Sequence, residues 1–491
     1  MKAEDSKYRT LVSKRRSVHI ATAIAVLLAI LIAFALVRLN FGAPPGTTLL
    51  PFGLLLLVPF IIAGLSSQPL NLLEPIYTVI FGYALFLLVR PAYILAYNDY
   101  TLINFLEADV QKIPLALLLA CLGLVGIYVG YYSPFGPAVA RALPSIGSRV
   151  SPQRIGMIGI LLAALGGLAY GVNALDQPAG VGELAAVRDP HEPDPRGSAY
   201  FLMGLDLVGS GIVLLFWWAK LSPRWWKFLV VVAFVGAFFL IGTNAASRYR
   251  VLYFGIALIT SYYLFIDRPF RFRDVLFLIS VASAYVIGVG FLRRGPQTDR
   301  EVAFSDLSRF DLGEAVDRFF SSEGDLGIFD AFLRLVTVIP RDYPYLFPGR
   351  TLAELLVHFV PRAIWEGKPL TTEVLVNYYM IGDYGVLKAQ GGNWVYSLPG
   401  SFYVEGGALA ILLGTILFGV FCRTVWNYYL IHNDVGAKML LAVTLPSILF
   451  HQRDGFTANN TFWYLIYLVP VLVGLYLSAT KSQDSKKGAG R

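Results

Sequence analysis

Long apolar stretches, separated by short polar connections, recur along most of this chain. A helix needs roughly 20 predominantly apolar residues to cross the hydrocarbon core of a bilayer. We therefore predict an all-α polytopic membrane protein with about twelve transmembrane helices. Their expected positions are residues 18–37, 49–65, 73–97, 113–132, 154–174, 199–218, 225–242, 250–266, 274–292, 401–422, 435–450 and 461–479.

One segment late in the chain interrupts this pattern. Residues 293–400 contain no apolar run of membrane length, so we predict that they form one large loop outside the membrane. This loop separates an N-terminal membrane region, 1–292, with nine predicted transmembrane helices from a C-terminal membrane region, 401–480, with three. Residues 481–491 are small, polar and basic, and we expect them to be a disordered cytoplasmic tail.

A structureless loop of this length would be unusual, so we expect it to contain short helices. Residues Gly327–Val338 space four apolar side chains along one helical face. A second helix is predicted to begin at Thr351, with Glu354 three residues later in the pattern of a capping box. Both helices are expected to lie flat in the outer interface of the membrane. Their apolar positions are Phe329, Phe332, Leu333 and Val336 in the first, and Leu352, Leu355, Leu356 and Phe359 in the second.

Local sequence features affect how we interpret the predicted spans at 73–97 and 18–37. The span at 73–97 contains Arg90 and Pro91, and we expect it to kink or to end there, because proline cannot donate a backbone hydrogen bond. The span at 18–37 is of membrane length and lacks a small-residue cleavage motif. We therefore interpret it as a membrane helix and not as a cleavable signal peptide.

Composition agrees with a membrane protein. The chain of 491 residues is 56% hydrophobic, its mean hydropathy is +0.61, and only 15% of its residues are charged. A soluble domain carries about 25% charged residues. The net charge of +8 would suggest a nucleic-acid partner in a soluble protein, but here the cations gather in short connections, so we expect no nucleic-acid partner. Cys121 and Cys422 lie in or beside apolar segments, which argues against a disulfide framework or a thiolate metal site.

The distribution of Lys and Arg predicts the orientation of the spans. Basic residues gather in the N-terminal tail, in the connections 141–154, 220–227 and 268–273, and after residue 480. Basic loops favour the cytoplasmic side of a membrane, so these connections and both termini are predicted to be cytoplasmic. With an even number of spans, the loop 293–400 then faces outward.

Three groups of arginines depart from this rule, because they fall at the predicted outer ends of spans. They are Arg248 with Arg250, Arg293 with Arg294, and Arg453. The planar guanidinium forms paired charge-assisted hydrogen bonds, which suits it to pyrophosphate. A single such arginine is explained as well by lipid headgroup binding or snorkelling. Three groups at one side favour a common anion site.

Several other polar groups need an explanation. Asp206 lies about two turns inside the sixth predicted span, where it either pairs with an outer arginine or serves the function directly. Glu405 is a candidate base, an arginine partner or a helix-start acid. His451 and Asp454 are further candidate bases, and His358 is the other outward histidine of interest. For each histidine the alternative is an ordinary polar contact.

Several familiar chemistries have no support in the sequence. No phosphate-binding Gly-rich loop, no His-Glu-x-x-His or Cys-x-x-Cys motif, and no Gly-x-Ser-x-Gly elbow is present. Nucleotide hydrolysis, a zinc site and a serine hydrolase therefore lack their usual signals. Residues 40–48, the first predicted outer loop, contain no acid, which argues against the membrane glycosyltransferases that carry an acidic pair there.

The architecture and three short motifs resemble Wzy-type O-antigen polymerases, also called oligosaccharide repeat-unit polymerases. The match extends over nearly the whole chain. One departure is visible: many relatives carry a Gly-Glu pair before the tyrosine, whereas here Gly400-Ser401 precedes Tyr403 and the acid is Glu405. The motifs are Ser247-Arg248-Tyr-Arg250, Pro361-Arg362-Ala-Ile-Trp365 followed by Lys368-Pro369, and Gly400-Ser-Phe-Tyr-Val-Glu-Gly-Gly407.

The resemblance implies a membrane glycosyltransferase (GT-C-like) fold shared with O-antigen ligases. It implies a multi-pass protein of the inner membrane whose site faces the periplasm, and a growing glycan transferred from its polyprenyl pyrophosphate carrier to the next lipid-linked repeat unit. No metal ion or other cofactor is implied. Donor and acceptor lipids, membrane lipids, a chain-length regulator and a flippase are the implied partners. The predicted pyrophosphate-binding residues are Arg248, Arg250, Arg293, Arg294, Arg362, Lys368 and Arg453, and the candidate bases are Glu405, His451 and Asp454.

Three other functions stay open at this point. An O-antigen ligase would use the same donor with lipid A core as acceptor. A transporter or flippase of lipid-linked sugars would place cationic residues along a central cavity and would not need a large outer loop. A structural scaffold would not need arginines gathered at one side.

Overall fold

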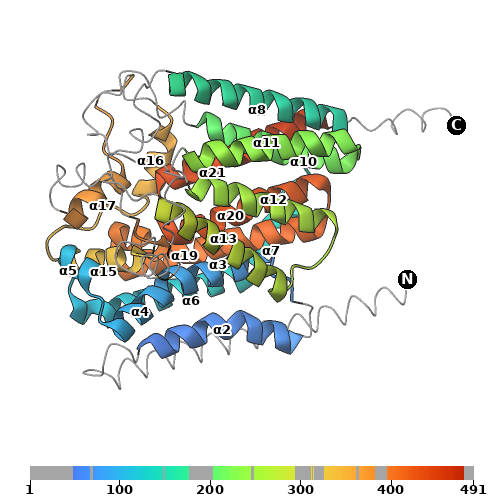
Figure 1. Ribbon diagram of the computed structural model, residues 1–491. Helices are drawn as coiled ribbons and strands as arrows, with labels where there is room; N and C mark the ends of the chain where they lie inside the picture. The colour runs from blue at the N-terminus through green and yellow to red at the C-terminus, as the bar shows by residue number, and fades with distance from the viewer. Residues whose placement is uncertain are drawn as a thin grey trace.

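The computed structural model describes residues 48–66, 70–146, 150–175, 203–244, 248–292, 311, 313, 326–360, 364–365, 367–381 and 395–479. Within these residues every regular element is helical, and one isolated bridge joins Val150 to Ala479. The long helices lie side by side in one bundle, and short helices gather at one of its ends (Figure 1). The predicted span at 18–37 and the tail 481–491 lie outside the described residues.

Helices of membrane length account for most of the described residues, which confirms the polytopic membrane class. Each predicted span that falls within the described residues coincides with a helix, while the total of twelve stays a prediction. Seven candidate spans are Pro75–Tyr97 (α3, Pro75–Tyr83; η2, Ala84–Leu88; α4, Val89–Tyr97), Val110–Tyr132 (with α6, Ile113–Tyr132), Pro152–Val172 (in α8, Pro152–Leu175), Gly204–Leu221 (α10), Leu398–His432 (α19), Val435–Asp454 (α20) and Ala458–Ser478 (α21). Shorter apolar stretches lie in α2 (Leu49–Ser66), α11 (Trp225–Asn244) and α12 (Arg248–Phe265), and α13 spans Phe272–Leu292.

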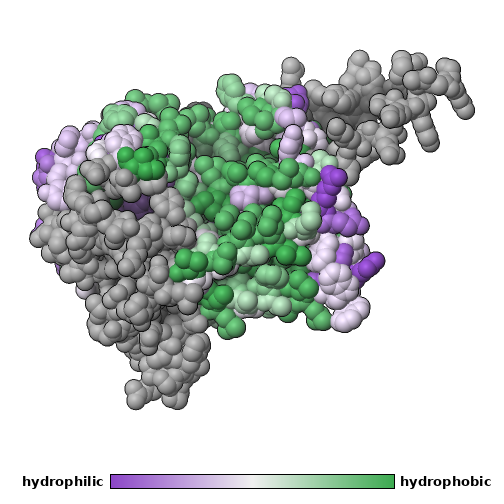
Figure 2. Space-filling view, turned by 90° about the horizontal axis from the view of Figure 1, so that it is seen from above, coloured by the Kyte–Doolittle hydropathy of each residue, from purple (hydrophilic) through white to green (hydrophobic). Residues whose placement is uncertain are grey.

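Large apolar side chains cover the outside of the bundle. Leu168, Leu240, Phe277 and Leu417 are each more than 60% exposed. Figure 2 shows a broad hydrophobic surface over the helices, with hydrophilic residues toward the right-hand and the left-hand ends. Contiguous exposed apolar surface of this extent is unfavourable in water and marks contact with lipid.

Small residues let the central helices approach one another closely. A Cβ on Gly166 of α8 would lie 2.3 Å from the carbonyl oxygen of Gly204 in α10. A Cβ on Gly130 of α6 would lie 2.0 Å from the carbonyl oxygen of Ile416 in α19. Close backbone approach is a principal source of helix association in lipid, where the hydrophobic effect does not draw helices together.

The predicted interruption at Arg90 and Pro91 takes the form of a widened turn. The helix does not end there, because α4 continues to Tyr97. The π-helical segment η2, Ala84–Leu88, comes immediately before α4. A π-helical turn relaxes the i to i−4 spacing, which makes room for the proline ring and for its missing N–H group.

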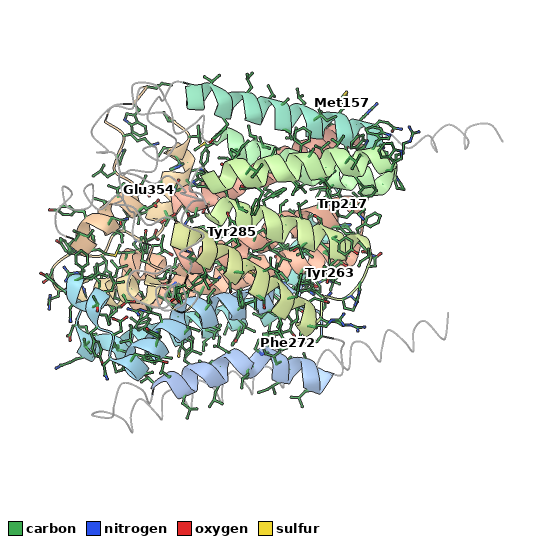
Figure 3. The ribbon with its side chains drawn as sticks, in the orientation of Figure 1. Met157, Trp217, Tyr263, Phe272, Tyr285 and Glu354 are labelled. Atoms are coloured by element: carbon green, nitrogen blue, oxygen red, sulfur yellow. The ribbon has the colours of Figure 1, made fainter. Side chains whose placement is uncertain are left out.

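We call the end of the bundle that carries the short helices the loop end, and the opposite end the tail end. The loop end carries α5 (Thr101–Phe105), α15 (Ile328–Val338), α16 (Arg350–His358) and α17 (Thr372–Ile381), whereas α7 (Phe135–Ala142) follows α6 at the tail end (Figure 1). Figure 3 likewise places Glu354 at the loop end and Trp217 and Tyr263 toward the tail end.

The connections that the charge distribution assigns to one side of the membrane meet at the tail end. The Ser145 hydroxyl donates to Asp434 at 2.6 Å, and the backbone N–H of Ser151 donates to the carbonyl of Ser478 at 2.9 Å. Lys438 pairs with Asp267 at 2.6 Å. The predicted alternation of the helices therefore agrees with the bundle, and the outward orientation of the loop end stays a prediction.

Helix α15 occupies the predicted residues, but the prediction that it lies flat in the membrane interface is wrong. Phe329, Phe332 and Leu333 are fully buried and belong to one apolar core with residues of α6 and α19. The polar side of the helix is also covered, since Asp330 is fully buried. Protein therefore surrounds α15 on both faces, which its periodicity alone does not reveal.

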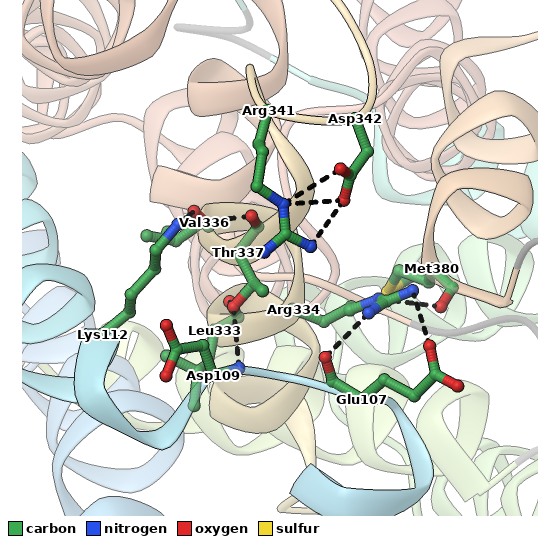
Figure 4. A network of polar contacts seen from close by, with 10 residues as sticks. All are labelled: Glu107, Asp109, Lys112, Leu333, Arg334, Val336, Thr337, Arg341, Asp342 and Met380. Carbon is green, nitrogen blue, oxygen red and sulfur yellow. Dashed lines mark hydrogen bonds and ion pairs between the residues drawn. The ribbon is translucent and has the colours of Figure 1, made fainter.

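Polar contacts fasten α15 to the segment between α4 and α6 (Figure 4). The Arg334 guanidinium donates to the carbonyl of Glu107 at 2.8 Å. The Lys112 ammonium donates to the carbonyl of Thr337 at 3.3 Å, and the backbone N–H of Asp109 donates to the hydroxyl of Thr337 at 3.0 Å. The two bonds to Thr337 are partly buried, and they tie the C-terminal end of α15 to the segment between α4 and α6.

A buried ion group, which we call the α15 anchor, completes this attachment. Its members are Arg90, Asp99 and Asp330. The Arg90 guanidinium donates to both carboxylate oxygens of Asp330, at 2.9 and 3.2 Å, and to Asp99 at 2.9 Å. Arg90 and Asp330 are both fully buried. Paired geometry of this kind offsets the large cost of removing the charges from water.

Helix α16 also occupies the predicted region, with a different start. Its N-cap residue is Gly349 in the left-handed conformation, and Thr351 lies inside the first turn. Leu352, Leu356 and Phe359 are between 55% and 74% exposed, so this helix does present its apolar face to the outside. Its placement against a membrane stays a prediction. Helix α17 has no counterpart among the sequence-based predictions.

Candidate functional site

The candidate site surrounds the first turns of α21, residues 457–467, which we call the α21 head. α20 ends at Asp454, and Gly455 turns the chain with φ 85°. A Cβ on Gly455 would lie 2.9 Å from the carbonyl oxygen of Ser397. Thr457 then caps α21 by accepting the N–H of Asn460 at 3.1 Å. This tight turn brings the end of α20, the start of α19 and the α21 head together.

Arg250 is held beside the α21 head by a carboxylate and an aromatic ring. Its Nε lies 3.3 Å from Oδ1 of Asp206, and its guanidinium lies 4.3 Å from the centre of the Trp463 ring. The Tyr467 hydroxyl donates to the same Asp206 oxygen at 2.8 Å. Asp206 is fully buried and Arg250 is 6% exposed. Of the two alternatives for Asp206, pairing with an arginine is therefore observed.

The polar face of α21 continues from Trp463 to Asn459. The Trp463 indole N–H donates to the side-chain oxygen of Asn459 at 3.1 Å. The Asn459 amide in turn acts electrostatically on the nearby carboxylate of Glu373 in α17. Asn459, Trp463 and Tyr467 are spaced by four residues, which places them on one face of the helix.

Glu373 is an acid that the sequence analysis did not select. Burial and the nearby charges of Asp454 and Glu354 raise its pKa to about 7, although the nearby Asn459 amide favours the charged form. A carboxyl group with a pKa in this range exchanges protons readily near neutral pH. The geometry therefore adds a titratable group to the α21 head.

The acids beside Glu373 each have their own arginine. Arg453 pairs with Asp454 at 2.7 Å, and Arg350 pairs with Glu354 at 2.7 Å. Glu354 also accepts the backbone N–H and the hydroxyl of Thr372, at 2.9 and 3.0 Å. These bonds tie α16 to the start of α17 and replace the capping box that was predicted within α16.

His451 is buried within α20 and forms an ordinary polar contact. Its Nδ1 lies 2.7 Å from the carbonyl oxygen of Ser447, which can only accept, so Nδ1 carries the hydrogen of that bond. The Ser447 hydroxyl also meets the hydroxyl of Tyr253 at 2.6 Å, and Tyr253 stacks on Tyr467 at 4.1 Å. His451 is thus connected to the Arg250 group through Tyr253. Whether it acts as a base stays a prediction.

Glu405 accepts two backbone hydrogen bonds at the start of α16. Its Oε2 accepts the N–H of Gly349 and its Oε1 accepts the N–H of Thr351, each at 2.9 Å. These are N–H groups that a helix cannot satisfy internally, and a carboxylate there also complements the helix dipole. Of the three roles considered for Glu405, the observed contacts are those of a helix-start acid, for a helix other than its own.

Helix α19 is broken directly after Glu405, at Gly406 and Gly407. Gly406 has φ −178° and ψ 30°, and Gly407 has φ 66° and ψ −148°. The positive φ suits glycine, and a Cβ on Gly407 would also lie 3.0 Å from the hydroxyl of Tyr345. The first part of α19 therefore runs in a different direction from the long part that follows.

Lys368 closes the other end of α16. Its ammonium donates to the carbonyls of His358 and Val360 at 2.8 and 3.0 Å, which complements the C-terminal end of the helix. The His358 ring packs against Phe462 of the α21 head at 4.9 Å. Burial and the charge of Lys368 lower the pKa of His358 to about 4, so this histidine is neutral at pH 7.

The remaining predicted residues are outside this geometry. Arg248 begins α12, but its side chain lies outside the described residues, as do Arg293, Arg294 and Arg362. Among the residues that the structure describes, no group of three or more His, Cys, Asp or Glu side chains is arranged to hold a metal ion. Cys121 and Cys422 are both free and buried.

Several buried polar atoms have no hydrogen-bond partner within the described part of the chain. Among them are Oδ2 of Asp206 and the hydroxyl of Tyr396, whereas others, such as the indole nitrogen of Trp217 and Nε2 of His432, lie elsewhere in the bundle. Buried polar atoms are nearly always bonded in folded proteins, so Asp206 and Tyr396 each keep an atom to which a further partner can bond.

Sequence reasoning missed Glu373, Asn459, Trp463, Tyr467 and Tyr396. One usable signal was the spacing of Asn459, Trp463 and Tyr467, which places polar-tipped side chains on one face of an apolar span. Glu373 carried no such signal, because its place depends on how α17 packs. Comparison of the chain with protein-family models, with curated proteins and with solved structures gives no match, so the geometry described above carries the functional argument.

Proposed function

We propose that this protein polymerises polyprenyl-pyrophosphate-linked oligosaccharide repeat units into O-antigen or another surface polysaccharide, without a metal ion. One observation carries the proposal. Arg250 and Arg453 lie with the carboxyl groups of Glu373 and Asp454 around the α21 head, at one end of an apolar bundle. A lipid carrier in the membrane would present its pyrophosphate at such an end.

The reaction requires positive donors for the leaving pyrophosphate and a base for the acceptor hydroxyl. The acceptor hydroxyl forms a bond to the anomeric carbon of the donor glycan, and the bond from that carbon to the pyrophosphate oxygen breaks. The pyrophosphate leaves with the electron pair, so positive donors must stabilise its charge. A base must receive the proton of the acceptor hydroxyl.

Arg250 fits the first role because it is held in place before the substrate arrives. Asp206 and Trp463 fix its guanidinium, as described above. A guanidinium has five N–H donors in a rigid fork, so an arginine that bonds a carboxylate can also bond a pyrophosphate. Preorganised donors of this kind need no rearrangement when charge develops on the leaving group.

The exposed face of α16 offers a place for the lipid chain of the carrier. Leu352, Leu356 and Phe359 form this face, and α16 packs against α21. A polyprenyl chain along this face would place its pyrophosphate near the α21 head. The same donor would serve an O-antigen ligase, in which lipid A core is the acceptor. Because the charged groups of the site gather at the loop end, a transporter is a weaker alternative.

The deciding experiment is incubation of the purified protein with a lipid-linked repeat unit, with and without lipid A core, followed by gel analysis of glycan length. We expect a ladder of products from the repeat unit alone, in the presence of EDTA. One-step transfer to lipid A core would identify a ligase instead. Loss of the ladder on chelation, with rescue by magnesium or manganese, would contradict the proposed use of arginines in place of a metal.

A further inference from the structure

A cavity lies at the tail end of the bundle, between α8, α10 and α11. Its volume is about 450 Å³, and residues of all three helices line it. Figure 3 places Met157, one of the lining residues, toward the tail end. The volume falls within the range of small-molecule sites. The α21 head is at the opposite end of the bundle, so an occupant of this cavity is distinct from the lipid-linked substrate of the proposed function.

Two tryptophan rings form one wall of the cavity. The Trp218 ring packs directly on α8, where a Cβ on Gly156 would lie 2.7 Å from it. The Trp226 ring meets Trp218 edge to face, with the ring centres 5.3 Å apart. Trp226 is 40% exposed, so this wall reaches the surface of the bundle. Tryptophan is favoured at the boundary between hydrocarbon and headgroups, because its ring is apolar and its N–H group is polar.

Lys227 places a positive charge against this wall. Its ammonium lies 4.4 Å from the centre of the Trp218 ring, and the residue is only 6% exposed. It donates to the carbonyl of Ser222 at 3.0 Å and to the hydroxyl of the same residue. Both partners are neutral oxygens, and an ammonium has three N–H donors. The bonds to Ser222 therefore leave one donor of Lys227 for a further partner.

Arg224 brings a second positive charge to the same cavity. It belongs to the connection between α10 and α11, and Gln153 adds a polar side chain from α8. Within the described part of the chain, neither Arg224 nor Lys227 forms an ion pair with a carboxylate, and no acid lines the cavity. Two cations that share a cavity without an acid repel each other, so an anion between them is favoured.

The lining of the cavity changes from polar to apolar along α8. Gln153, Met157 and Ile160 share one face of the helix, because they are spaced by four and three residues. Gln153 lies in the first turn, whereas Met157 and Ile160 lie deeper in the bundle and are 67% and 45% exposed. A small inorganic anion would use only the polar part. A lipid uses both parts, since its charged headgroup lies at the membrane surface and its acyl chains extend into the hydrocarbon.

We propose that this cavity binds the headgroup of an anionic phospholipid from the surrounding membrane. Arg224 and Lys227 bond the headgroup phosphate, and the exposed side chains of Met157 and Ile160 contact an acyl chain. Basic pockets between transmembrane helices suit such headgroups. A cap on the C-terminal end of α10 accounts for the bonds of Lys227 to Ser222, but it does not account for Arg224 or for the cavity.

The test measures lipid binding to the purified full-length protein in detergent by native mass spectrometry. Phosphatidylglycerol and phosphatidylcholine are titrated separately, because both contain a phosphate but only the first has a net negative charge. We expect phosphatidylglycerol to bind about tenfold more tightly, since two cations act on its charge. Arg224→Gln should weaken this binding about fivefold, which corresponds to the loss of one cation near a lipid headgroup.

Arg273→Gln is the matched control. It removes the same charge at the tail end, its side chain is 77% exposed, and it does not line the cavity. Its affinity for phosphatidylglycerol should equal that of the unaltered protein. An equal loss in Arg224→Gln and Arg273→Gln would indicate general attraction to surface charge and would overturn the proposal, as would equal affinity for the two lipids.

Two further measurements sharpen the assignment. Glycerol 3-phosphate carries a charged phosphate without acyl chains, and we expect it not to displace the lipid. Displacement at concentrations equal to those of the lipid would identify a site for a soluble phosphate compound instead. Lys227→Met keeps an apolar stem over Trp218 without the ammonium, and unchanged affinity in the folded variant would overturn the role of Lys227. If this variant does not fold because α10 loses its cap, Arg224→Gln and its control decide.

Discussion

Two groups of buried charges lie at the loop end, and they differ in how completely the protein supplies their partners. In the α15 anchor, Arg90 bonds both oxygens of Asp330 and one oxygen of Asp99 at 2.9–3.2 Å. At the α21 head, Oδ2 of Asp206 and the hydroxyl of Tyr396 are buried without a hydrogen-bond partner within the described residues.

Under the proposed function, the difference separates a structural group from a substrate-binding one. A buried ion group with matched partners stabilises one arrangement of the helices and leaves little for a ligand to improve. A group with unmatched atoms is less favourable on its own, and a ligand that bonds those atoms gains the difference. The loop end thus has one part that holds α15 in place and another whose unpartnered atoms would bind the polar part of the substrate under the proposed function.

The largest effect is expected from disruption of the α15 anchor. Arg90→Ala leaves two carboxylates at the loop end without their cation, one of them fully buried, and should lower the free energy of unfolding by about 3–5 kcal/mol. Thermal unfolding in detergent and abundance in membranes measure this loss. Arg273→Ala, at a position whose side chain is 77% exposed, is the control. If the Arg90→Ala protein were stable and had lost only its turnover, the α15 anchor would not be a purely structural group, and its contrast with the α21 head would fail.

The next largest effect is expected on turnover, from the arginines of the site. Arg250→Ala should lower the rate of glycan transfer about 10²–10³-fold, and Arg250→Lys should restore only part of it, since the fork geometry is lost. Membrane abundance is measured beside glycan length, because Asp206 loses its partner. Arg341→Ala is the matched control, since Arg341 pairs with Asp342 on the surface.

The same substitutions at Arg248 and Arg293 extend this test to residues selected from the sequence. If these arginines only anchor helices among lipid headgroups, lysine should serve almost as well as arginine. Abundant alanine variants at all three positions with normal polymerisation would contradict the pyrophosphate-binding role.

A smaller effect is expected from Glu405, whose carboxylate accepts two backbone hydrogen bonds at the start of α16. Glu405→Gln keeps one acceptor oxygen but loses the charge at the start of α16, so the free energy of unfolding should fall by about 1.5–3 kcal/mol. Turnover per folded molecule should change only a few-fold. A stable Glu405→Gln protein without any turnover would instead identify Glu405 as the base.

The smallest effect on the protein is expected from single cysteines that report orientation. Glu107→Cys at the loop end and Arg273→Cys at the tail end both replace well-exposed side chains, at 82% and 77% exposure. In intact spheroplasts an impermeant thiol reagent should label the first and reach the second only after lysis. The buried Cys121 and Cys422 keep the background low. The reverse pattern would overturn the predicted outward site.

The two kinds of helix at the loop end show where sequence-based prediction succeeds and where it stops. α15 was predicted from its periodicity within one residue of its observed bounds, yet its polar face turned out to be buried. α17 was not predicted, although it contributes Glu373. Periodicity reports which side chains share a face, but it does not report what that face contacts.

The sequence by itself determined the membrane class and the positions of the spans, because lipid imposes a length and an apolar composition on each helix separately. It also selected Arg250, Asp206, Arg453 and Asp454, since charged groups near the ends of apolar spans are rare enough to stand out. Only the tertiary structure decided that Asp206 pairs with Arg250 and that the Asn459 amide lies near Glu373, residues 44 and 86 positions apart in the chain. Such pairings depend on how separate helices pack, and no local pattern of residues encodes that packing.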